Sequence, residues 1–269
     1  MIPNVLSIAG TDPSGGAGAQ ADLKSFSAHG AFGMSVVTAL VAQTTTGVAE
    51  VHEVPPEFVT AQLTTLLDDV RVDAVKIGML ANAEVIRAVV NVLDRYAPPH
   101  VVLDPVMVAK SGDLLLERRA VGALREALLP QATLLTPNLP EAGVLLDERP
   151  VETLKEMRRV AERLRNIMAH AGQRWVMLKG GHLPGDETVD LLYDGDRMIE
   201  LPGQRVATRN THGTGCTLSA ALAALLPQSE DVPQAAHRAK AYLAEALRHA
   251  DRLQVGSGHG PTHHFHAWW

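Results

Sequence analysis

Short apolar runs alternate with longer amphipathic segments over most of the chain, and this alternation constrains the fold more than any other feature. The short runs, which we expect to be strands, span residues 4–10, 73–80, 100–107, 132–138 and 174–181. The segments with helical spacing span residues 17–30, 56–70, 82–96, 117–129, 151–171 and 233–250. Strands that alternate with helices in this way predict an α/β fold, with a mostly parallel central sheet covered by helices on both faces.

Local signals add detail to this prediction. Pro56 lies in the first turn of its helix, and Asn82 is the N-cap of the next one. Residues 34–43 are rich in β-branched and apolar side chains, and the polar cluster 41–47 closes a strand. In the C-terminal half, residues 189–203 place an Asp-Gly pair between two apolar runs, which predicts a β-hairpin.

Length and composition limit the classes of protein. A chain of 269 residues can bury one large core, so we expect a single domain over residues 1–269. The net charge of −6 argues against a nucleic-acid-binding surface, which would be basic. The single cysteine cannot form an internal disulfide, and neither a secretory signal nor an apolar stretch of membrane-spanning length is evident. We therefore expect a cytoplasmic protein that binds neither nucleic acid nor membrane.

The motif THGTGCT, at residues 211–217, is typical of a phosphate cradle. The amides of Gly213, Thr214, Gly215 and Cys216 could point at a bound phosphate, and a helix predicted from Thr217 would add positive potential. A thiol at a helix N-terminus is expected to have a lowered pKa, so Cys216 could accept a proton from a substrate hydroxyl. Alternatively Cys216 only positions that hydroxyl, or it is a small buried apolar residue.

Oxygen ligands follow two predicted strands. Asn138 and Glu141 lie three residues apart after the run 132–138, and Asp104 lies near the end of the run 100–107. Such side chains can hold Mg²⁺, often through water. Taken separately, each is more often a cap or turn residue.

Other polar residues suit a small-molecule site. The glycine-rich stretch 9–26 lacks the G-x-G-x-x-G spacing and the later acidic residue of a nicotinamide site, so we reject that interpretation. Asp22 follows this loop and could meet a polar small molecule, or it is a solvated helix residue. Gln43 can donate and accept hydrogen bonds at a heterocycle edge. Lys179 and Lys240 could meet nucleotide phosphates, although a lysine such as Lys240 on a helix is usually solvated.

Two further segments allow more than one interpretation. Residues 108–116 combine Gly and Ser with polar residues, so they form either a mobile flap or an ordinary loop. Residues 259–269 are rich in histidine but lack a carboxylate or cysteine, so docking by aromatic side chains is favoured over a metal site.

The ordered set SIAGTDPSGGAGAQADLKSF, KIGML, VLDPVM, LLTPNLPEA, LKGGH and THGTGCTLSAALAA resembles the hydroxymethylpyrimidine/phosphomethylpyrimidine kinases of thiamine biosynthesis, a ribokinase-like family. The resemblance extends from about residue 4 to the C-terminus. It implies a ribokinase-like fold and an enzyme that uses ATP and Mg²⁺. Such an enzyme phosphorylates 4-amino-5-hydroxymethyl-2-methylpyrimidine and then its monophosphate. Homodimers are usual in the family.

The resemblance also implies roles for residues that match the motifs of the family. The predicted pyrimidine pocket is lined by Gly10, Asp22, Val41, Gln43, Met79 and Val106. Residues 213–216 would form the anion hole, where Cys216 replaces the aspartate of ribokinase relatives. The predicted nucleotide, phosphate and magnesium residues are Asp104, Asn138, Glu141, Lys179 and Lys240, with Asp104 and Glu141 nearest the metal. Two other hypotheses stay open: a pyridoxal-type vitamin kinase, and a binding protein that has lost catalysis.

Overall fold

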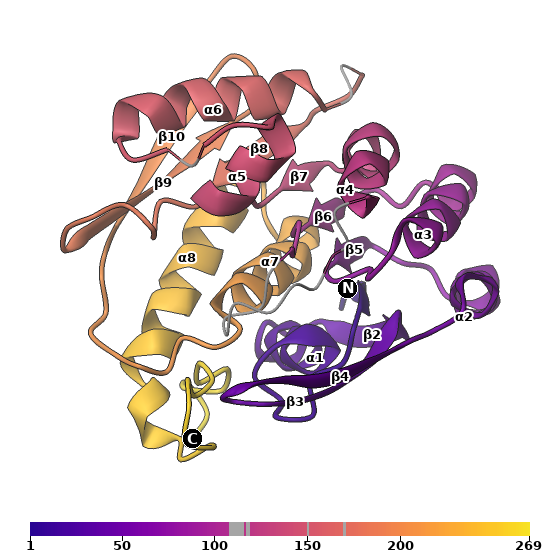
Figure 1. The fold of residues 1–269 in the computed structure, drawn as a ribbon, viewed down its shortest axis with the longest axis horizontal. Helices are drawn as coiled ribbons and strands as arrows, with labels where there is room; N and C mark the ends of the chain where they lie inside the picture. Colours follow the sequence, from indigo (N-terminus) through magenta and orange to yellow (C-terminus); the bar gives the residue numbers. More distant parts are fainter. Residues whose placement is uncertain (108–115, 117–118, 150, 169–170) are drawn as a thin grey trace.

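An eight-stranded sheet with the order β10-β9-β8-β7-β6-β5-β1-β2 crosses the molecule (Figure 1). The computed structural model describes the whole chain except residues 108–115, 117–118, 150 and 169–170. The strands of this sheet are β1 (Asn4–Ala9), β2 (Phe32–Val37), β5 (Ala74–Ile77), β6 (Val101–Leu103), β7 (Leu134–Leu135), β8 (Trp175–Leu178), β9 (Glu187–Tyr193) and β10 (Met198–Gln204). From β8 to β2 neighbouring strands are parallel, whereas β9 and β10 pair in the antiparallel sense. The mostly parallel sheet is therefore confirmed.

The predicted hairpin is also present. Strands β9 and β10 pair from Glu187↔Gln204 to Tyr193↔Met198, and the turn holds Gly195 at a φ of 115°. Asp194 accepts hydrogen bonds from the backbone amides of Asp196 and Arg197, at 3.0 and 2.7 Å. The local chemistry of the Asp-Gly pair thus forms the turn that its sequence predicts.

The run 34–43 belongs to two sheets. Strand β2 ends at Val37, and β3 (Ala39–Thr44) pairs with β4 (Gly47–Glu53) in a separate two-stranded sheet that the sequence did not reveal. Thr38 lies between them, where its hydroxyl donates to the Met79 carbonyl at 2.6 Å. This hydrogen bond connects the junction between β2 and β3 to the segment that follows β5.

Helices cover both faces of the main sheet (Figure 1). The helices and helical turns are α1 (Gly18–Ala28), α2 (Pro56–Asp69), α3 (Ala83–Tyr96), α4 (Ala120–Ala123), η1 (Leu124–Leu128), η2 (Leu129–Gln131), α5 (Leu139–Leu146), α6 (Leu154–Asn166), α7 (Thr214–Leu225), η3 (Leu226–Gln228), α8 (Val232–Arg248) and η4 (Ala250–Arg252). One apolar core lies between the sheet and α2 to α6, and a second lies between the sheet and α1, α7 and α8.

The alternation of side chains along the strands produces these two cores. In β1, Leu6 and Ile8 belong to the first core and Val5 to the second. In β8, Val176 and Leu178 belong to the first core, and Trp175 and Met177 belong to the second. Strands that bury both faces require continuous apolar sequence, which explains why the sequence identified them as apolar runs.

Helix boundaries differ from the predictions in several places. Asn82 does cap α3 and accepts from the Val85 amide at 2.9 Å, and Pro56 begins α2. The helix predicted over 151–171 is α6, which begins later because Thr153 and Glu156 form a capping box. The helix predicted over 117–129 is α4 followed by a π-turn and a 3-10 turn. Apart from Leu116, the flap predicted at 108–116 lies outside the described residues.

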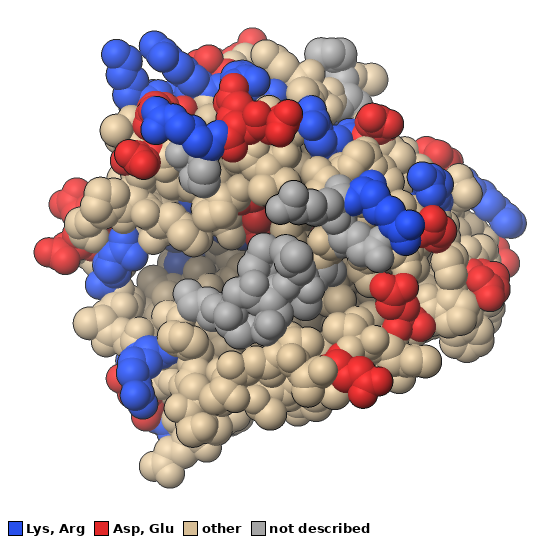
Figure 2. Space-filling view, viewed as in Figure 1, with Lys and Arg blue, Asp and Glu red and all other residues tan. Residues whose placement is uncertain are grey.

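The outer surface carries charges of both signs. Figure 2 shows Lys and Arg mixed with Asp and Glu along the upper rim of this face, where α6 lies, and a hollow left of the centre. Within the part of the chain that the structure describes, none of the helices has both the length and the apolar composition that a membrane crossing requires.

Candidate functional site

Several predicted site residues follow neighbouring parallel strands. Gly10 follows β1, Asp104 follows β6, Asn138 follows β7, and Lys179 follows β8. Asn138 and Lys179 also form an isolated parallel bridge, so the two strand ends stay side by side. The carboxyl ends of parallel strands form the edge where α/β folds bind ligands. The fold therefore brings these residues to one edge of the sheet.

The residues predicted to form the anion hole lie at the start of α7. Gly213 is the N-cap with a φ of 75°, and a Cβ atom there would lie only 1.7 Å from the Gly16 carbonyl oxygen. Helix α7 begins at Thr214, three residues before the predicted start. The Thr214 amide makes a long contact of 3.4 Å with the Thr211 carbonyl. Among the described residues, the amides of Gly215 and Cys216 have no carbonyl acceptor, so these donors are available to an anion.

The same helix start faces the predicted phosphate and metal residues. A Cβ atom at Gly215 would lie 3.4 Å from both Asp104 Oδ2 and Lys179 Nζ. Lys179 Nζ in turn donates to Asp104 Oδ1 at 3.0 Å and lies 4.0 Å from Glu141 Oε2. Residues from four separate parts of the sequence therefore meet around one small volume.

Asp104 is buried and ionised in this arrangement. Burial alone would raise its pKa, but the ammonium groups of Lys179 and Lys76 hold the pKa of Asp104 below its usual value. The Thr136 hydroxyl donates to Asp104 Oδ1 at 3.1 Å, and the Ser219 hydroxyl lies 3.3 Å from Oδ2. Burial likewise lowers the pKa of Lys179, yet Asp104 and Glu141 raise it above its usual value. The two residues form a buried ion pair.

Asn138 and Glu141 form a capping box at the start of α5. Asn138 Oδ1 accepts from the Glu141 amide at 2.8 Å, and Glu141 Oε2 accepts from the Asn138 amide at 2.7 Å. Burial and the Asp104 carboxylate together raise the pKa of Glu141 to about 7, against the lowering effects of Lys179 and the Asn138 amide. Glu141 can therefore be both a cap residue and a site residue, because the capping box holds its carboxylate in place beside Asp104 and Lys179.

The donor set at this corner fits Mg²⁺ in its usual form. Asp104 and Glu141 provide two carboxylates, and Glu141 Oε1 has no hydrogen-bond donor among the described residues. Mg²⁺ typically takes one or two carboxylates and completes its octahedron with water and substrate phosphates. Nowhere in the described ranges do three or more His, Cys, Asp or Glu side chains group so as to hold a metal ion by themselves.

Lys240 lies outside this cluster. Its Nζ donates to Asp190 Oδ2 and to the Leu201 carbonyl, both at 2.6 Å. Asp190 also accepts from the Gly180 amide at 2.8 Å, so Lys240 is connected to the residue after Lys179 through one carboxylate. Lys240 is therefore not a solvated helix lysine, and its approach to a nucleotide phosphate stays a prediction.

The expected lowering of the pKa of Cys216 is wrong. The residue is half-buried in the first turn of α7, and desolvation raises the pKa of its thiol to about 11. Lys76 and the Gly18 amide lower the pKa, whereas the carboxylates of Asp22 and Asp104 raise it. The helix dipole is outweighed, so the resting group at neutral pH is the thiol.

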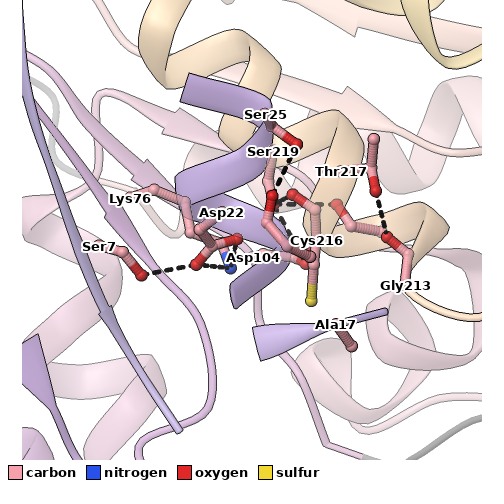
Figure 3. A network of polar contacts seen from close by, with 12 residues as sticks. Ser7, Ala17, Asp22, Ser25, Lys76, Asp104, Gly213, Cys216, Thr217 and Ser219 are labelled. Atoms are coloured by element: carbon pink, nitrogen blue, oxygen red, sulfur yellow. Dashed lines mark hydrogen bonds and ion pairs between the residues drawn. The ribbon is translucent and has the colours of Figure 1, made fainter. Parts of the chain in front are cut away.

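A buried ion pair lies beside Cys216 (Figure 3). Lys76 Nζ donates to both oxygens of Asp22, at 2.8 and 2.9 Å, and the Ser7 hydroxyl donates to Asp22 Oδ2 at 2.6 Å. All three side chains are fully buried, so Asp22 is not a solvated helix residue. Burial raises the pKa of Asp22, and Lys76 lowers it; we assign Asp22 as ionised because both oxygens accept from the ammonium group. Sequence reasoning did not find Lys76.

Three of the predicted pocket residues meet directly. A Cβ atom at Gly10 would lie 3.2 Å from Met79 Sδ and 3.7 Å from Val41 Cγ2. Val41 and Met79 belong to a small apolar cluster, and the half-buried Gln43 lies two residues further along β3. Val106 is half-buried, and its amide donates to the Asp104 carbonyl at 2.8 Å. Gly10, Val41 and Met79 thus form an apolar wall beside a polar edge.

Asp12 is a central residue that sequence reasoning missed. Its carboxylate accepts from the amides of Ser14 and Ala17, both at 2.8 Å, and contacts His212 Nε2 at 2.7 Å. Burial alone would raise the pKa of Asp12, but hydrogen bonds from His212, Ser14 and Gln43 lower it. Asp12 therefore connects the N-terminal glycine loop with the anion-hole motif. The sequence Asp-Pro-Ser at residues 12–14 is typical of an Asx-turn and could have indicated the role of Asp12.

Comparison with known proteins identifies relatives over nearly the full chain. A sequence model of the family described as phosphomethylpyrimidine kinase matches residues 12–263. The hydroxymethylpyrimidine/phosphomethylpyrimidine kinase of Escherichia coli K12 is 54% identical over 266 residues, which cover 99% of this chain and 98% of that protein. The thiamine biosynthesis bifunctional protein ThiED of Geobacter sulfurreducens is 47% identical over 261 residues, covering 97% of this chain and 52% of that protein.

Solved structures with the same fold include two kinds of vitamin kinase. The ADP complex of Bacillus subtilis pyridoxal kinase has a TM-score of 0.90 and 35% identity, and the match covers 99% of each chain. The phosphomethylpyrimidine kinase from Clostridium difficile 630 has a TM-score of 0.80 and 38% identity, covering 91% of this chain and 99% of that one. The ribokinase-like α/β architecture expected from the sequence is thus confirmed.

Proposed function

This chain belongs to the phosphomethylpyrimidine kinase family, and we propose on that premise that it acts on 4-amino-5-hydroxymethyl-2-methylpyrimidine. It transfers the γ-phosphoryl group of ATP to the hydroxymethyl oxygen, then phosphorylates the monophosphate to the pyrophosphate, in thiamine biosynthesis. The observation that carries the proposal is the position of the α7 start. The amides of Gly215 and Cys216 lie beside Asp104 and Lys179, at the edge where the strands end.

The anion hole would stabilise the phosphoryl group during transfer. Two backbone donors and the helix dipole favour the negative charge that spreads over the equatorial oxygens. A loose transition state needs little help from a base, so a protonated Cys216 suffices if it holds the attacking hydroxyl in line. We therefore favour Cys216 as a positioning group over Cys216 as a resting thiolate base.

The charged corner would receive the nucleotide phosphates. Asp104 and Glu141 would hold Mg²⁺ through oxygen and water, and the metal would neutralise phosphate charge when bound. Lys179 provides a cation at the same corner, where it holds Asp104 in a fixed position before substrate arrives. Asn138 fixes Glu141 through the capping box, and Lys240 would approach the nucleotide from α8.

The pyrimidine would bind between an apolar wall and polar groups. Val41 and Met79 suit the faces of an uncharged ring, and the lack of a side chain at Gly10 leaves room for it. Gln43 can both donate to and accept from an aminopyrimidine edge. Asp22 would act at the inner end of the pocket, and Val106 would close the opposite side.

Three broader properties are part of the proposal. Residues 1–269 act as one kinase domain, which the eight-stranded sheet with strands between Asn4 and Gln204 supports. The enzyme is a cytoplasmic homodimer, for which exposed apolar side chains on β2 and β3 offer an interface. Its partners are ATP, Mg²⁺ and the pyrimidine, with no role for nucleic acid or membrane.

Pyridoxal is the alternative substrate, because a pyridoxal kinase is among the similar structures at 35% identity. Steady-state ATP consumption should be measured with the pyrimidine alcohol, its monophosphate and pyridoxal, with products identified by mass spectrometry. We expect kcat/KM for the pyrimidine alcohol to exceed that for pyridoxal by roughly tenfold or more, since a site that pairs with polar substrate edges discriminates strongly.

A matched control excludes contaminating kinases. The Lys179→Ala variant, purified in the same way, should lose activity on every substrate because it leaves Asp104 unpaired at the phosphate corner. A clear preference of the wild type for pyridoxal would replace our proposal with the alternative. Tight pyrimidine binding without ATP consumption would instead indicate a binding protein.

A further inference from the structure

The C-terminal segment 258–264 runs alongside the anion-hole motif. The His212 amide donates to the Gly260 carbonyl at 3.0 Å, and His212 forms a bridge with Pro261. At the other end of the segment, the amides of Gly258 and His259 donate to Thr45, at 3.1 and 3.0 Å. The segment therefore joins the β3–β4 turn to the residues that precede α7.

Residues 260–264 of this segment are part of the packed interior. Thr262, His263 and His264 are 0%, 1% and 5% exposed. The Tyr242 hydroxyl donates to the His264 carbonyl at 2.8 Å, and the His263 amide donates to the Ala246 carbonyl at 3.0 Å. Both hydrogen bonds hold the segment against α8, so its position relative to α7 is fixed.

His264 reaches the anion hole through one hydroxyl. Thr217 Oγ1 donates to the carbonyl of Gly213, the N-cap of α7, at 2.8 Å. This uses the single proton of the Thr217 hydroxyl, so the groups 3.1 Å away, His264 Nε2 and Thr262 Oγ1, must donate to it. Burial lowers the pKa of His264 to about 3, so its ring is neutral at pH 7 and carries its one proton on Nε2.

We propose that His264 is a positioning residue for phosphoryl transfer, acting through Thr217 on the Gly213 carbonyl and hence on the amides of Gly215 and Cys216. Two donors aimed at Thr217 Oγ1 fix the direction in which its own proton points. With its proton fixed in this direction, the Thr217 hydroxyl holds the Gly213 carbonyl in place. The left-handed backbone of Gly213, which precedes α7, is thereby held as well. The catalytic consequence of this chain of hydrogen bonds rests on the proposed function of the anion hole.

The geometry predicts an effect on kcat rather than on KM. Under the proposed function, the nucleotide and the pyrimidine would contact other residues in the ground state, whereas the amides of the anion hole would act on charge that develops during transfer. His264→Ala should therefore lower kcat by about tenfold and change KM by less than about threefold, because a small displacement of preorganised donors is costly. His264→Gln, which retains a donor near the position of Nε2, should recover most of the loss.

His266 provides a matched control in the same segment. Its ring packs against Tyr242 and His249, with centroids 5.5 and 5.7 Å away, and among the described residues it makes no hydrogen bond or ring contact with α7. His266→Ala should leave kcat near the wild-type value. Thr217→Val removes the intermediate hydroxyl, so the double variant Thr217→Val/His264→Ala should be no slower than Thr217→Val alone.

Amide hydrogen exchange tests the positioning directly, without substrate. The Thr217 amide donates to the Gly213 carbonyl at 2.8 Å, so its exchange reports on the first turn of α7. Exchange in peptides covering 213–217 should accelerate at least threefold or so in His264→Ala and remain unchanged in His266→Ala. Equal exchange in the two variants would refute the proposal, as would an exchange difference with no loss of kcat. If the wild type turns over no pyrimidine, the proposed function fails separately, and equal exchange in the two variants would still overturn the positioning role.

Discussion

The thiol of Cys216 lies where two effects on its pKa oppose each other. The α7 N-terminus and Lys76 favour the thiolate, whereas desolvation and the carboxylates of Asp22 and Asp104 favour the thiol. Desolvation prevails, since it raises the pKa to about 11. A helix N-terminus is therefore insufficient evidence for an activated cysteine when buried carboxylates lie close by.

This balance predicts slow alkylation of Cys216 in the ligand-free enzyme. Only the thiolate reacts, and a pKa of about 11 leaves very little of it at neutral pH. Iodoacetamide labelling at pH 7.5, followed by mass spectrometry, should be slower by roughly a few hundredfold than for a free cysteine of pKa about 8.5. The rate should rise about tenfold per pH unit until the pH approaches the pKa.

The single cysteine makes this measurement unambiguous. The Cys216→Ser variant has no thiol and should take up no label. A labelling rate that reaches a plateau below pH 9 would show that the pKa is lowered, and would restore the thiolate base as the better interpretation.

Some site residues could be identified from the sequence, and others could not. Glycines 213 and 215 were both identified from their motif, but only Gly213 has the positive φ and the close backbone approach that require glycine. Asp12 was missed although its Asx-turn is local. Lys76 and Ser7 gave no signal, since each lies in an apolar run and its partner Asp22 is distant along the chain.

The capping boxes of two helices show that one local motif can have different roles. Asn138 and Glu141 begin α5, and Thr153 and Glu156 begin α6. The first box is partly buried beside Asp104 and Lys179, whereas the second is exposed to solvent. Sequence alone can identify both motifs, but only the fold distinguishes the one that holds a carboxylate in the site.

Glu141→Gln should change the pH dependence of stability. The folded pKa of Glu141, about 7, exceeds the ordinary value of 4.5, so the folded state binds a proton that the unfolded state has released. The wild type should therefore lose stability as the pH rises from about 4.5 to 7. Glutamine keeps the cap and removes this loss, which is of order 1–3 kcal/mol. Urea unfolding at pH 5 and pH 8 measures the difference.

Glu156→Gln is the matched control for this prediction. Glu156 occupies the same position in an exposed capping box, so its replacement should leave the difference between pH 5 and pH 8 nearly unchanged. An identical loss of stability with rising pH in Glu141→Gln and the wild type would contradict our account. We also expect Glu141→Gln to lower kcat/KM, since it removes a carboxylate from the phosphate corner.

Elements were predicted best where the signal is local. The Asp194-Gly195 hairpin and the Asn82 cap formed as expected, because turn and cap geometry depend on adjacent residues. The division of 34–43 between two sheets was missed, since an apolar run does not reveal which strand it will pair with. The late start of α6 was missed although its capping box is visible in the sequence.

The arrangement of the whole molecule leaves apolar side chains exposed on β2, at the edge of the main sheet, and on β3 of the two-stranded sheet. Phe32 on β2 is 61% exposed, and Leu40 on β3 is 51% exposed. β2 is also the terminal strand of the main sheet, which leaves its outer edge without a neighbour in the sheet order. Exposed apolar residues at such an edge are typical of an interface between subunits, and they support the proposed homodimer.

Leu40→Glu should shift the enzyme from dimer to monomer, because a carboxylate buried in an apolar contact is unfavourable. Sedimentation velocity at micromolar concentration measures the change. Val144→Glu is the control, since Val144 is an exposed apolar residue on α5, away from β2 and β3. A wild type that sediments as a monomer would contradict the homodimer, and a dimer in Leu40→Glu would place the interface elsewhere.

By itself the sequence determined the α/β alternation, the hairpin, the α3 cap and the glycines of the anion hole. These features depend on side-chain period and backbone preference, which neighbouring residues set. Only the tertiary structure decided that Lys179 neutralises Asp104, that Lys76 holds Asp22, and that His264 reaches Thr217. It also reversed the expected pKa of Cys216. Desolvation and ion pairing depend on distances in space between groups far apart in the chain, and no local pattern of residues records those distances.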